Sequence, residues 1–182
     1  ERWQFGFVFN VFSGAPLYLT SGRSSWNTFG DNTPTAVAPL AKSAGTVRKT
    51  GNGVVYFDGF QQVADPSIAG LTTLNGIQGR STLRAIADSS GRIILVNPTP
   101  GTLGNLAPGF LEGPGDFRLD INLIKRVRIK EGMSFEFRID AIDVSNTPHF
   151  GLPNADMNST NFGRITSASG NRILVVGARV NF

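Results

Sequence analysis

Hydrophobic and polar residues alternate strictly along the last eleven residues, 172–182. One set of alternate positions is wholly apolar, while the other includes arginine and asparagine. Successive side chains of a β-strand point to opposite faces, so this pattern predicts a strand with one apolar face and one face that can border water. The apolar set is Leu174, Val176, Ala178, Val180 and Phe182.

Three earlier segments show the same period of two. The first, at residues 3–20, carries five large apolar side chains in alternate positions, and Gly14 and Pro16 predict a bend or bulge within it. The apolar positions are Trp3, Phe5, Phe7, Phe9 and Val11. This segment therefore predicts a strand with a strongly hydrophobic face.

The other two segments, 117–130 and 133–146, alternate apolar side chains with charged ones. Lys130-Glu131-Gly132 is a tight connection between them, which predicts an antiparallel hairpin. Lys125 breaks the pattern by falling on the apolar face, so we expect it either to snorkel to a membrane boundary or to mark a bulge. The apolar face of the hairpin is expected to contain Phe117, Leu119, Ile121, Leu123, Val127, Ile129, Met133, Phe135, Phe137 and Ile139.

Two long stretches, 21–116 and 147–171, separate these strands. The first is more than half of the chain and too long for a structureless loop, so we expect it to contain its own strands. Val54–Phe57 and Ile93–Val96 are the candidates, and they are expected to form a small hairpin or lid.

Composition agrees with an all-β chain. The 182 residues include 22 Gly and 10 Pro, with 40% hydrophobic residues and a mean hydropathy of −0.03. No apolar run approaches the roughly 18–20 residues that a spanning helix requires. Strands of a membrane barrel escape this criterion, because only every second residue faces lipid. Four antiparallel membrane-spanning strands are therefore the predicted fold.

Several kinds of chemistry are disfavoured. The chain has no cysteine and one histidine, His149, which excludes a thiolate or histidine-rich metal site. Its formal charge of +4 comes from scattered Lys and Arg, so we expect no nucleic-acid partner. Phosphate loops, calcium loops and nucleophile elbows are missing from the sequence. We expect no catalytic site, no cofactor and no bound metal.

Five carboxylates could in principle support acid–base chemistry. They alternate with arginines on the polar strand faces, so we expect cross-strand ion pairs instead, such as Asp120 or Glu136 with Arg118 or Arg138. The carboxylates are Asp116, Asp120, Glu136, Asp140 and Asp143.

Aromatic residues of the 21–116 stretch are candidates for contact with a ligand. Trp26, Tyr56, Phe57 and Phe60 could stack on a sugar or peptide. The alternative, which we favour, is that they form the small core of a loop subdomain.

Several groups of residues resemble the C-terminal barrel strands of TonB-dependent outer-membrane receptors, particularly the Oar-like group. The terminal phenylalanine resembles the barrel-assembly signal of these receptors, which maps to Val176, Ala178, Val180 and Phe182. Asp143 and Ser145 depart from the asparagine and aromatic usual in the family. The matching segments are Trp3–Pro16, Gly113–Asp120, Phe135–Ala141, Asn146–Gly151 with Pro153-Asn154, and Asn161–Thr166.

The resemblance implies a 22-stranded barrel of a Gram-negative outer membrane, plugged by an N-terminal domain and driven through TonB to take up a scarce ligand. The chain would supply the last four strands as a fragment without the plug. Its partners would be outer-membrane lipid, the barrel-assembly machinery, the other strands and plug, TonB and an unknown small ligand. Periplasmic turns of such barrels are short, so residues 130–132 would be periplasmic and stretches 21–116 and 147–171 extracellular.

Two other functions are compatible with parts of the pattern. A surface structural or adhesive barrel protein would share every strand feature and lack the plug and the TonB-contacting segment. A secreted β-sandwich that binds glycans would turn its apolar faces inward against a second sheet.

Overall fold

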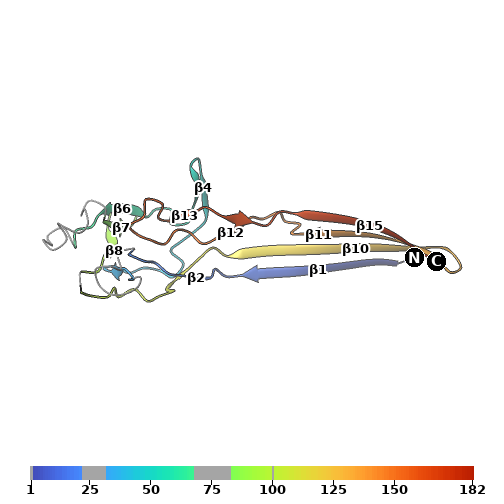
Figure 1. Cartoon of the computed structure of the whole chain (residues 1–182), viewed down its shortest axis with the longest axis horizontal. Coiled ribbons are helices and arrows are strands. Elements are labelled where there is room, and N and C mark those ends of the chain that lie inside the picture. The colour runs from blue at the N-terminus through green and yellow to red at the C-terminus, as the bar shows by residue number, and fades with distance from the viewer. Residues whose placement is uncertain (1, 22–31, 68–82, 100) are drawn as a thin grey trace. The chain divides into compact units, whose positions relative to one another are not determined.

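The computed structural model describes residues 2–21, 32–67, 83–99 and 101–182 (Figure 1). The regular secondary structure of these residues consists of β-strands alone, which confirms the predicted all-β fold class. None of these residues belongs to a helix long and apolar enough to cross a membrane. The strands fall into two compact units. The first contains Glu1–Ser13, Gly115–Phe150 and Ala168–Phe182, and the second contains Gly14–Pro114 and Gly151–Ser167.

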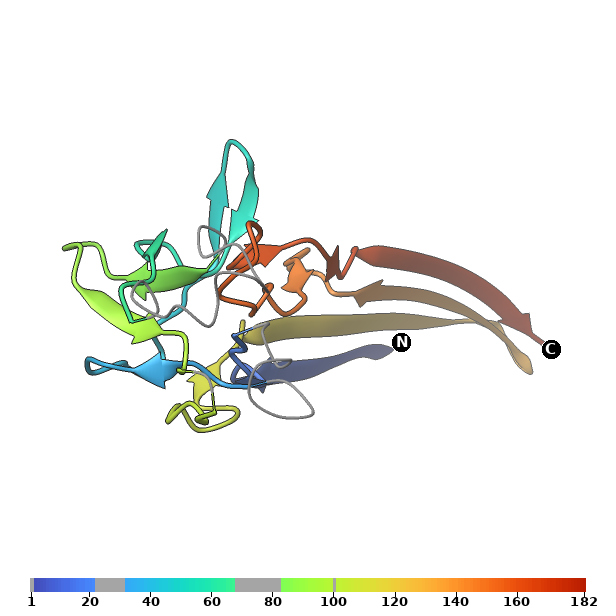
Figure 2. The same cartoon turned by 60° about the vertical axis from the view of Figure 1, so that its left-hand side comes forward.

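The first unit is built on a four-stranded antiparallel sheet with the order β1-β10-β11-β15. Its long strands lie side by side, and both chain termini lie at the end where β10 turns into β11 (Figures 1 and 2). Gly132, with φ of 77°, supplies the left-handed conformation in that turn. The strands are β1 (Arg2–Phe12), β10 (Asp116–Lys130), β11 (Met133–Ile142) and β15 (Ile173–Asn181).

The register of the sheet assigns each residue to one of two faces. Phe5, Leu123, Ile139 and Val176 form one transverse row, and Gly6, Asn122, Asp140 and Val175 form the next. Rows like the first make up the apolar face. Strand by strand, in the order of the sheet, its residues are Trp3, Phe5, Phe7, Phe9 and Val11; Phe117, Leu119, Ile121, Leu123, Lys125 and Val127; Phe135, Phe137, Ile139 and Ala141; and Leu174, Val176, Ala178 and Val180. Rows like the second make up the polar face. In the same strand order, its residues are Gln4, Gly6, Val8 and Asn10; Arg118, Asp120, Asn122, Ile124 and Arg126; Glu136, Arg138, Asp140 and Ile142; and Ile173, Val175, Gly177 and Arg179.

Lys125 stays in register on the apolar face. Its Nζ lies 4.7 Å from the centroid of the Trp3 ring, a cation–π contact. The irregularity in the hairpin lies further on, between Arg128 and Lys130. Of the two expectations for Lys125, the bulge is therefore wrong.

Two strands are shorter than expected. The segment expected at 3–20 is divided into β1 and the short β2 (Pro16–Leu17), which pairs with β9 (Leu111–Glu112) in the second unit. Gly14 lies between them, where a Cβ would fall 1.7 Å from the carbonyl oxygen of Gly113. The segment expected at 133–146 ends at Ile142, because Asp143 has φ of 48° and turns the chain out of the ladder.

A short ladder completes the first unit. In it, β12 (His149–Phe150) pairs antiparallel with β14 (Ala168–Ser169). Gly170 follows β14 with φ of 88°.

The second unit contains further small sheets. One has the order β3-β8-β7-β6, and another the order β13-β5-β4. The expected Ile93–Val96 strand is β8, whereas Val54 and Val55 belong to β5 in the other sheet, so the two candidate strands do not pair with each other. The strands are β3 (Thr35–Ala36), β4 (Arg48–Thr50), β5 (Gly53–Val55), β6 (Gln61–Ala64), β7 (Arg84–Ala87), β8 (Ile93–Val96) and β13 (Arg164–Ile165).

The core of the second unit lies around β7 and β8. Leu83, Ala85, Ile86, Ala87 and Leu95 are fully buried. Burying apolar surface of this kind contributes about 25 cal/mol per Å² and gives the short strands the stability that they lack individually.

Candidate functional site

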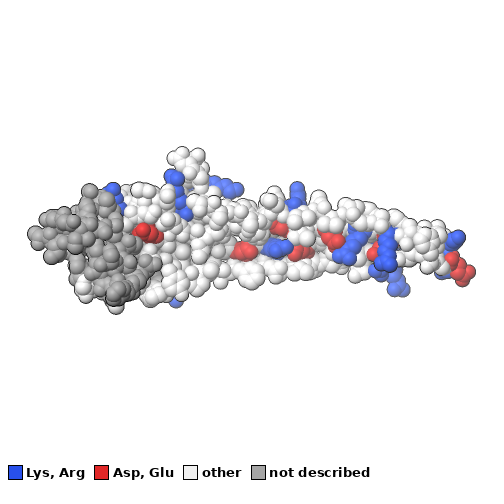
Figure 3. All heavy atoms as spheres, in the orientation of Figure 1, with Lys and Arg blue, Asp and Glu red and all other residues white. Residues whose placement is uncertain are grey.

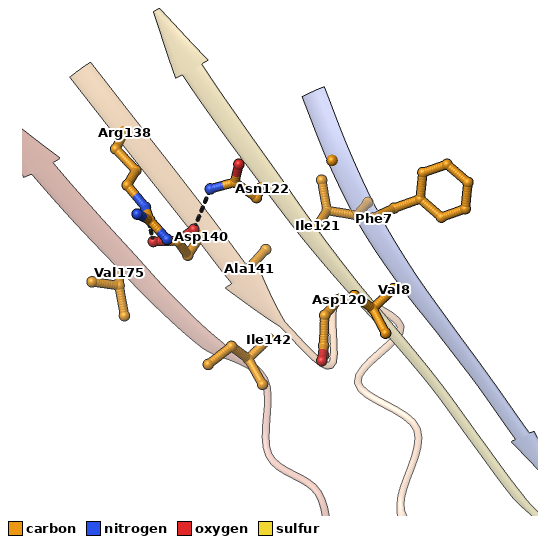
Figure 4. A pocket seen from close by; sticks show the side chains of 11 residues that line it. Phe7, Val8, Asp120, Ile121, Asn122, Arg138, Asp140, Ala141, Ile142 and Val175 are labelled. Carbon is orange, nitrogen blue, oxygen red and sulfur yellow. Dashed lines mark hydrogen bonds and ion pairs between the residues drawn. The ribbon is translucent and has the colours of Figure 1, made fainter. Parts of the chain in front are cut away.

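A hollow of about 490 Å³ lies beside the middle strands of the first unit. The polar face supplies its charged and amide groups, and Figure 4 shows Arg138, Asp140 and Asn122 gathered on one side, with Phe7 pointing away from them. The polar-face residues in its lining are Gly6, Val8, Asp120, Asn122, Arg138, Asp140, Ile142 and Val175.

The charged groups of the hollow already have partners. Arg138 Nε lies 2.7 Å from Asp140 Oδ2, and the Asn122 amide donates to Asp140 Oδ1. Asp120 Oδ1 accepts the Asp143 main-chain N–H at 2.8 Å. Because both carboxylates are held by donors, the arrangement suits a polar wall rather than acid–base catalysis.

Further pairs extend the same face. Arg118 Nε lies 3.2 Å from Asp120 Oδ1, and Arg126 Nε lies 2.5 Å from Glu136 Oε2. Acidic and basic side chains alternate along the visible face of the long strands in Figure 3. Two of the pairs, Arg118–Asp120 and Arg138–Asp140, join residues two apart on one strand, whereas the sequence pattern suggested cross-strand pairs.

Aliphatic side chains make up the rest of the hollow. Val8, Ile142 and Val175 lie on the polar face among the charged groups, and Val8 and Val175 are exposed. The hollow can therefore contact a partner that has both polar and apolar parts. No group of three or more His, Asp or Glu side chains that could hold a metal ion occurs within the described ranges.

The candidate ligand-contacting aromatics lie in the second unit, apart from Trp26, which is outside the described residues. Tyr56 and Phe57 are buried, at 4% and 5% exposure. The Phe57 ring is stacked between Phe60, at 5.4 Å, and Phe162, at 5.2 Å. A ligand contact by these residues stays a prediction, and only Phe60 of the three is more than marginally exposed.

Tyr56 is tied into the same cluster through its hydroxyl. It donates to the main-chain carbonyl of Glu112 at 2.7 Å. Burial, and next the nearby Glu112 charge, raise the pKa of Tyr56 above its ordinary value, so the hydroxyl stays protonated near neutral pH.

The candidate assembly-signal residues lie at the free edge of the sheet. Val176, Ala178 and Val180 are exposed on the apolar face of β15. Phe182 follows the strand and is 92% exposed. Recognition of these side chains by an assembly factor stays a prediction.

Sequence reasoning missed a buried polar network in the second unit. Asp65 Oδ2 accepts from the Asn97 main-chain N–H at 2.6 Å and from its side-chain amide at 2.7 Å. The Asn158 amide donates to Asn97 Oδ1 at 2.7 Å and its oxygen accepts the Arg84 N–H at 2.8 Å. Asp65-Pro66-Ser67 is a recognisable turn sequence, but nothing local indicates its distant partners.

Three comparisons bear on what kind of protein this is. The sequence model of one protein family, described as "Outer membrane beta barrel domain", matches residues 1–175. A search of curated proteins found no match, and a search of solved structures also found none.

Proposed function

The chain belongs to the outer membrane beta barrel domain family, and we propose that it is the C-terminal part of a TonB-dependent receptor that takes up a scarce ligand into the periplasm. Its location is the outer membrane, and its long strands are transmembrane strands. The receptor type, the energy coupling and the transport are the proposal.

The open sheet of the first unit is the observation that carries the proposal. Within the described residues, β1 pairs only with β10, and β15 pairs only with β11. An unpaired backbone group costs several kcal/mol in hydrocarbon, so these two edges require further strands. The need for more strands supports a barrel larger than this chain, as the 22-stranded receptors are.

The position of the receptor-like sequences gives further support. Asp116–Asp120 and Phe135–Ala141 lie on the adjacent central strands β10 and β11. The resemblance therefore covers one continuous piece of barrel wall.

The two faces have the properties that a barrel wall needs. Phe5, Phe7 and Leu174 on the apolar face are each more than 60% exposed, an unusual surface for contact with water but a suitable one for lipid. The polar face, with its paired charges and its hollow, suits a lumen that holds a plug or passes a ligand.

Loop lengths suggest the orientation. We infer that the short turn at residues 130–132 is periplasmic and that the stretches 21–116 and 147–171 are extracellular. Phe182 then lies at the periplasmic end. The proposed partners are lipid, the assembly machinery, the remaining strands and plug, TonB through the N-terminal part and a small ligand. The proposed role involves no catalysis, cofactor or nucleic acid.

The gene upstream of the codon for Glu1 provides the first test. We expect a continuous reading frame that encodes an exported plug domain and about eighteen further amphipathic strands. A start codon and signal peptide immediately before Glu1 would contradict the proposal.

Transport provides the second test. The complete protein would be produced in cells with and without TonB, and uptake would be measured for iron complexes, cobalamin, glycans and peptides. Uptake of one class that falls to background without TonB is the expected result. Surface adhesion that is unchanged without TonB, with no uptake, would favour a structural or adhesive barrel protein.

A further inference from the structure

The only histidine of the chain lies between two carboxylates that come from different elements. Nδ1 of His149, in β12, is hydrogen-bonded to Oδ1 of Asp116 at the start of β10. Nε2 lies 3.4 Å from Oδ2 of Asp143, in the turn that follows β11. One imidazole ring thus contacts β10 and the β11 turn at once.

The carboxylate of Asp143 is buried beside the ring. The residue is 2% exposed, and its Oδ1 accepts the Ser145 hydroxyl at 2.9 Å. Its Oδ2 is buried and has no hydrogen-bond partner among the described residues. An ionised carboxylate in such a place is costly unless a positive charge lies next to it. Within the described residues, His149 is the group at ion-pair distance that can supply this charge.

We propose that His149 is a pH-sensitive clasp, which holds the β12–β14 ladder against the start of β10 and the β11 turn while its ring is protonated, and releases it when the ring loses its proton. The ring is enclosed as a clasp requires, because its side chain is only 17% exposed. Gly170, after β14, fits closely against it. A Cβ at that position would fall 1.9 Å from Cδ2 of the ring.

The surrounding charges favour the protonated ring. From β10 the nearby charged groups are Asp116, Arg118 and Asp120, and Arg118 is already paired with Asp120 at 3.2 Å. The β11 turn contributes Asp143. On the β14 side lies Arg172, whose main-chain N–H donates to Asn146 Oδ1 at 3.1 Å. Two carboxylates therefore face the ring, those of Asp116 and Asp143.

The direction of the pH dependence follows from the hydrogen bond. The bond to Asp116, followed by the charges of Asp116 and Asp143, raises the pKa of His149 above its ordinary 6.5, although burial opposes the shift. A group whose pKa is raised on folding contributes its full stabilisation below the unfolded value and loses it as the pH rises through the folded value. The clasp should thus be closed at low pH and open as the pH rises through the raised pKa of His149.

A spin label on β14 tests the clasp in the complete protein in outer-membrane vesicles. Ala168 is exposed and pairs with Phe150, and this chain has no cysteine, so Ala168→Cys gives one attachment point within it. Electron paramagnetic resonance spectra would be recorded from pH 6 to pH 9. We expect the immobile fraction of the label to fall at least twofold over this range.

Two variants separate the charge of the ring from its shape. His149→Gln can keep a hydrogen bond but carries no charge, so its label should be as mobile at pH 6 as the parent label is at pH 9. Asp143→Asn keeps the shape of the buried side chain and should reduce the pH response at least twofold. A correctly folded barrel is checked for each variant by its altered gel mobility before and after heating.

A label in the second unit provides the control. Ser89 is exposed beside Asp88, and the Ser90 hydroxyl bonded to Asp88 lowers the pKa of that carboxyl, so the turn keeps its charge from pH 6 to pH 9. A Ser89→Cys label should show no pH response. An unchanged Ala168 label across the range, or an equal response in His149→Gln, would overturn the proposal. The clasp does not depend on the receptor function, because it requires only a folded barrel.

Discussion

Two neighbouring valines of β15 allow a direct test of which face of the sheet meets lipid. Val176 lies on the apolar face and is 64% exposed, while Val175 lies on the polar face and is 48% exposed. The two positions share residue type, strand and depth. Replacing each valine with arginine therefore isolates the effect of the face of the sheet on which the side chain lies.

The position of Val176 along the membrane normal determines how much an arginine there destabilises the protein. With a strand rise of about 3.4 Å and a tilt of about 40°, the apolar face from Phe117 to Val127 covers about 26 Å along the membrane normal, close to the lipid band of about 25 Å. Leu123, in the row of Val176, falls near its middle. Val176→Arg should lower the free energy of unfolding by about 2–4 kcal/mol, the cost of arginine at the midplane.

The matched variant should be nearly neutral. Val175 lies opposite Asp140 on the polar face, where an arginine would border water and a carboxylate. Val175→Arg should therefore stay within about 0.5 kcal/mol of the parent protein. Ala178→Arg, in the row of Lys125 near the edge of the lipid band, should cost about 0–1 kcal/mol.

Urea unfolding of the complete protein in lipid vesicles measures these differences. At equal unfolding slopes, a loss of about 2 kcal/mol corresponds to roughly a thirtyfold change in the folded-to-unfolded ratio. Equal losses at positions 175 and 176 would refute the assignment of the two faces. An Ala178→Arg loss as large as that of Val176→Arg would refute the depth assignment.

Three further predictions concern single side chains. Asn97→Ala removes a buried donor from Asp65 and should cost about 1–3 kcal/mol, seen as faster hydrogen exchange in β7 and β8; unchanged exchange would contradict the network. Phe57→Ala removes the middle ring of a three-ring stack and should cost about 3–5 kcal/mol in thermal unfolding, whereas a loss below about 1 kcal/mol would show that the stack is not a core. Gly170→Ala adds a Cβ against the His149 ring at positive φ, and a loss of unfolding free energy of more than about 1 kcal/mol is expected; a neutral result would show that the ring is not held there.

The facing of the strands could be predicted because it is a local property. A period of two assigns Phe5 and Val176 to one face whatever the rest of the chain does, and the register of the sheet places them in one row. Lys125 was the ambiguous residue. Its place against the Trp3 ring depends on a residue more than a hundred positions away, which no local pattern contains.

The surroundings of His149 show the same limit: a local sequence pattern does not identify distant partners. In the sequence, His149 stands between a proline and a phenylalanine, and Asp143 and Asp116 are two carboxylates among several. Only the turn at Asp143 and the pairing of β12 with β14 bring the three side chains together. Their chemistry depends on burial, which is decided by packing rather than by residue type.

Alternation and turn residues alone determined four amphipathic strands, the hairpin at residues 130–132 and the apolar edge that ends at Phe182, because side-chain direction in a strand follows from residue parity. Tertiary structure alone decided how the short strands of the second unit pair and which polar groups are buried together. Those features depend on contacts between residues far apart in sequence, whose partners a local pattern cannot identify.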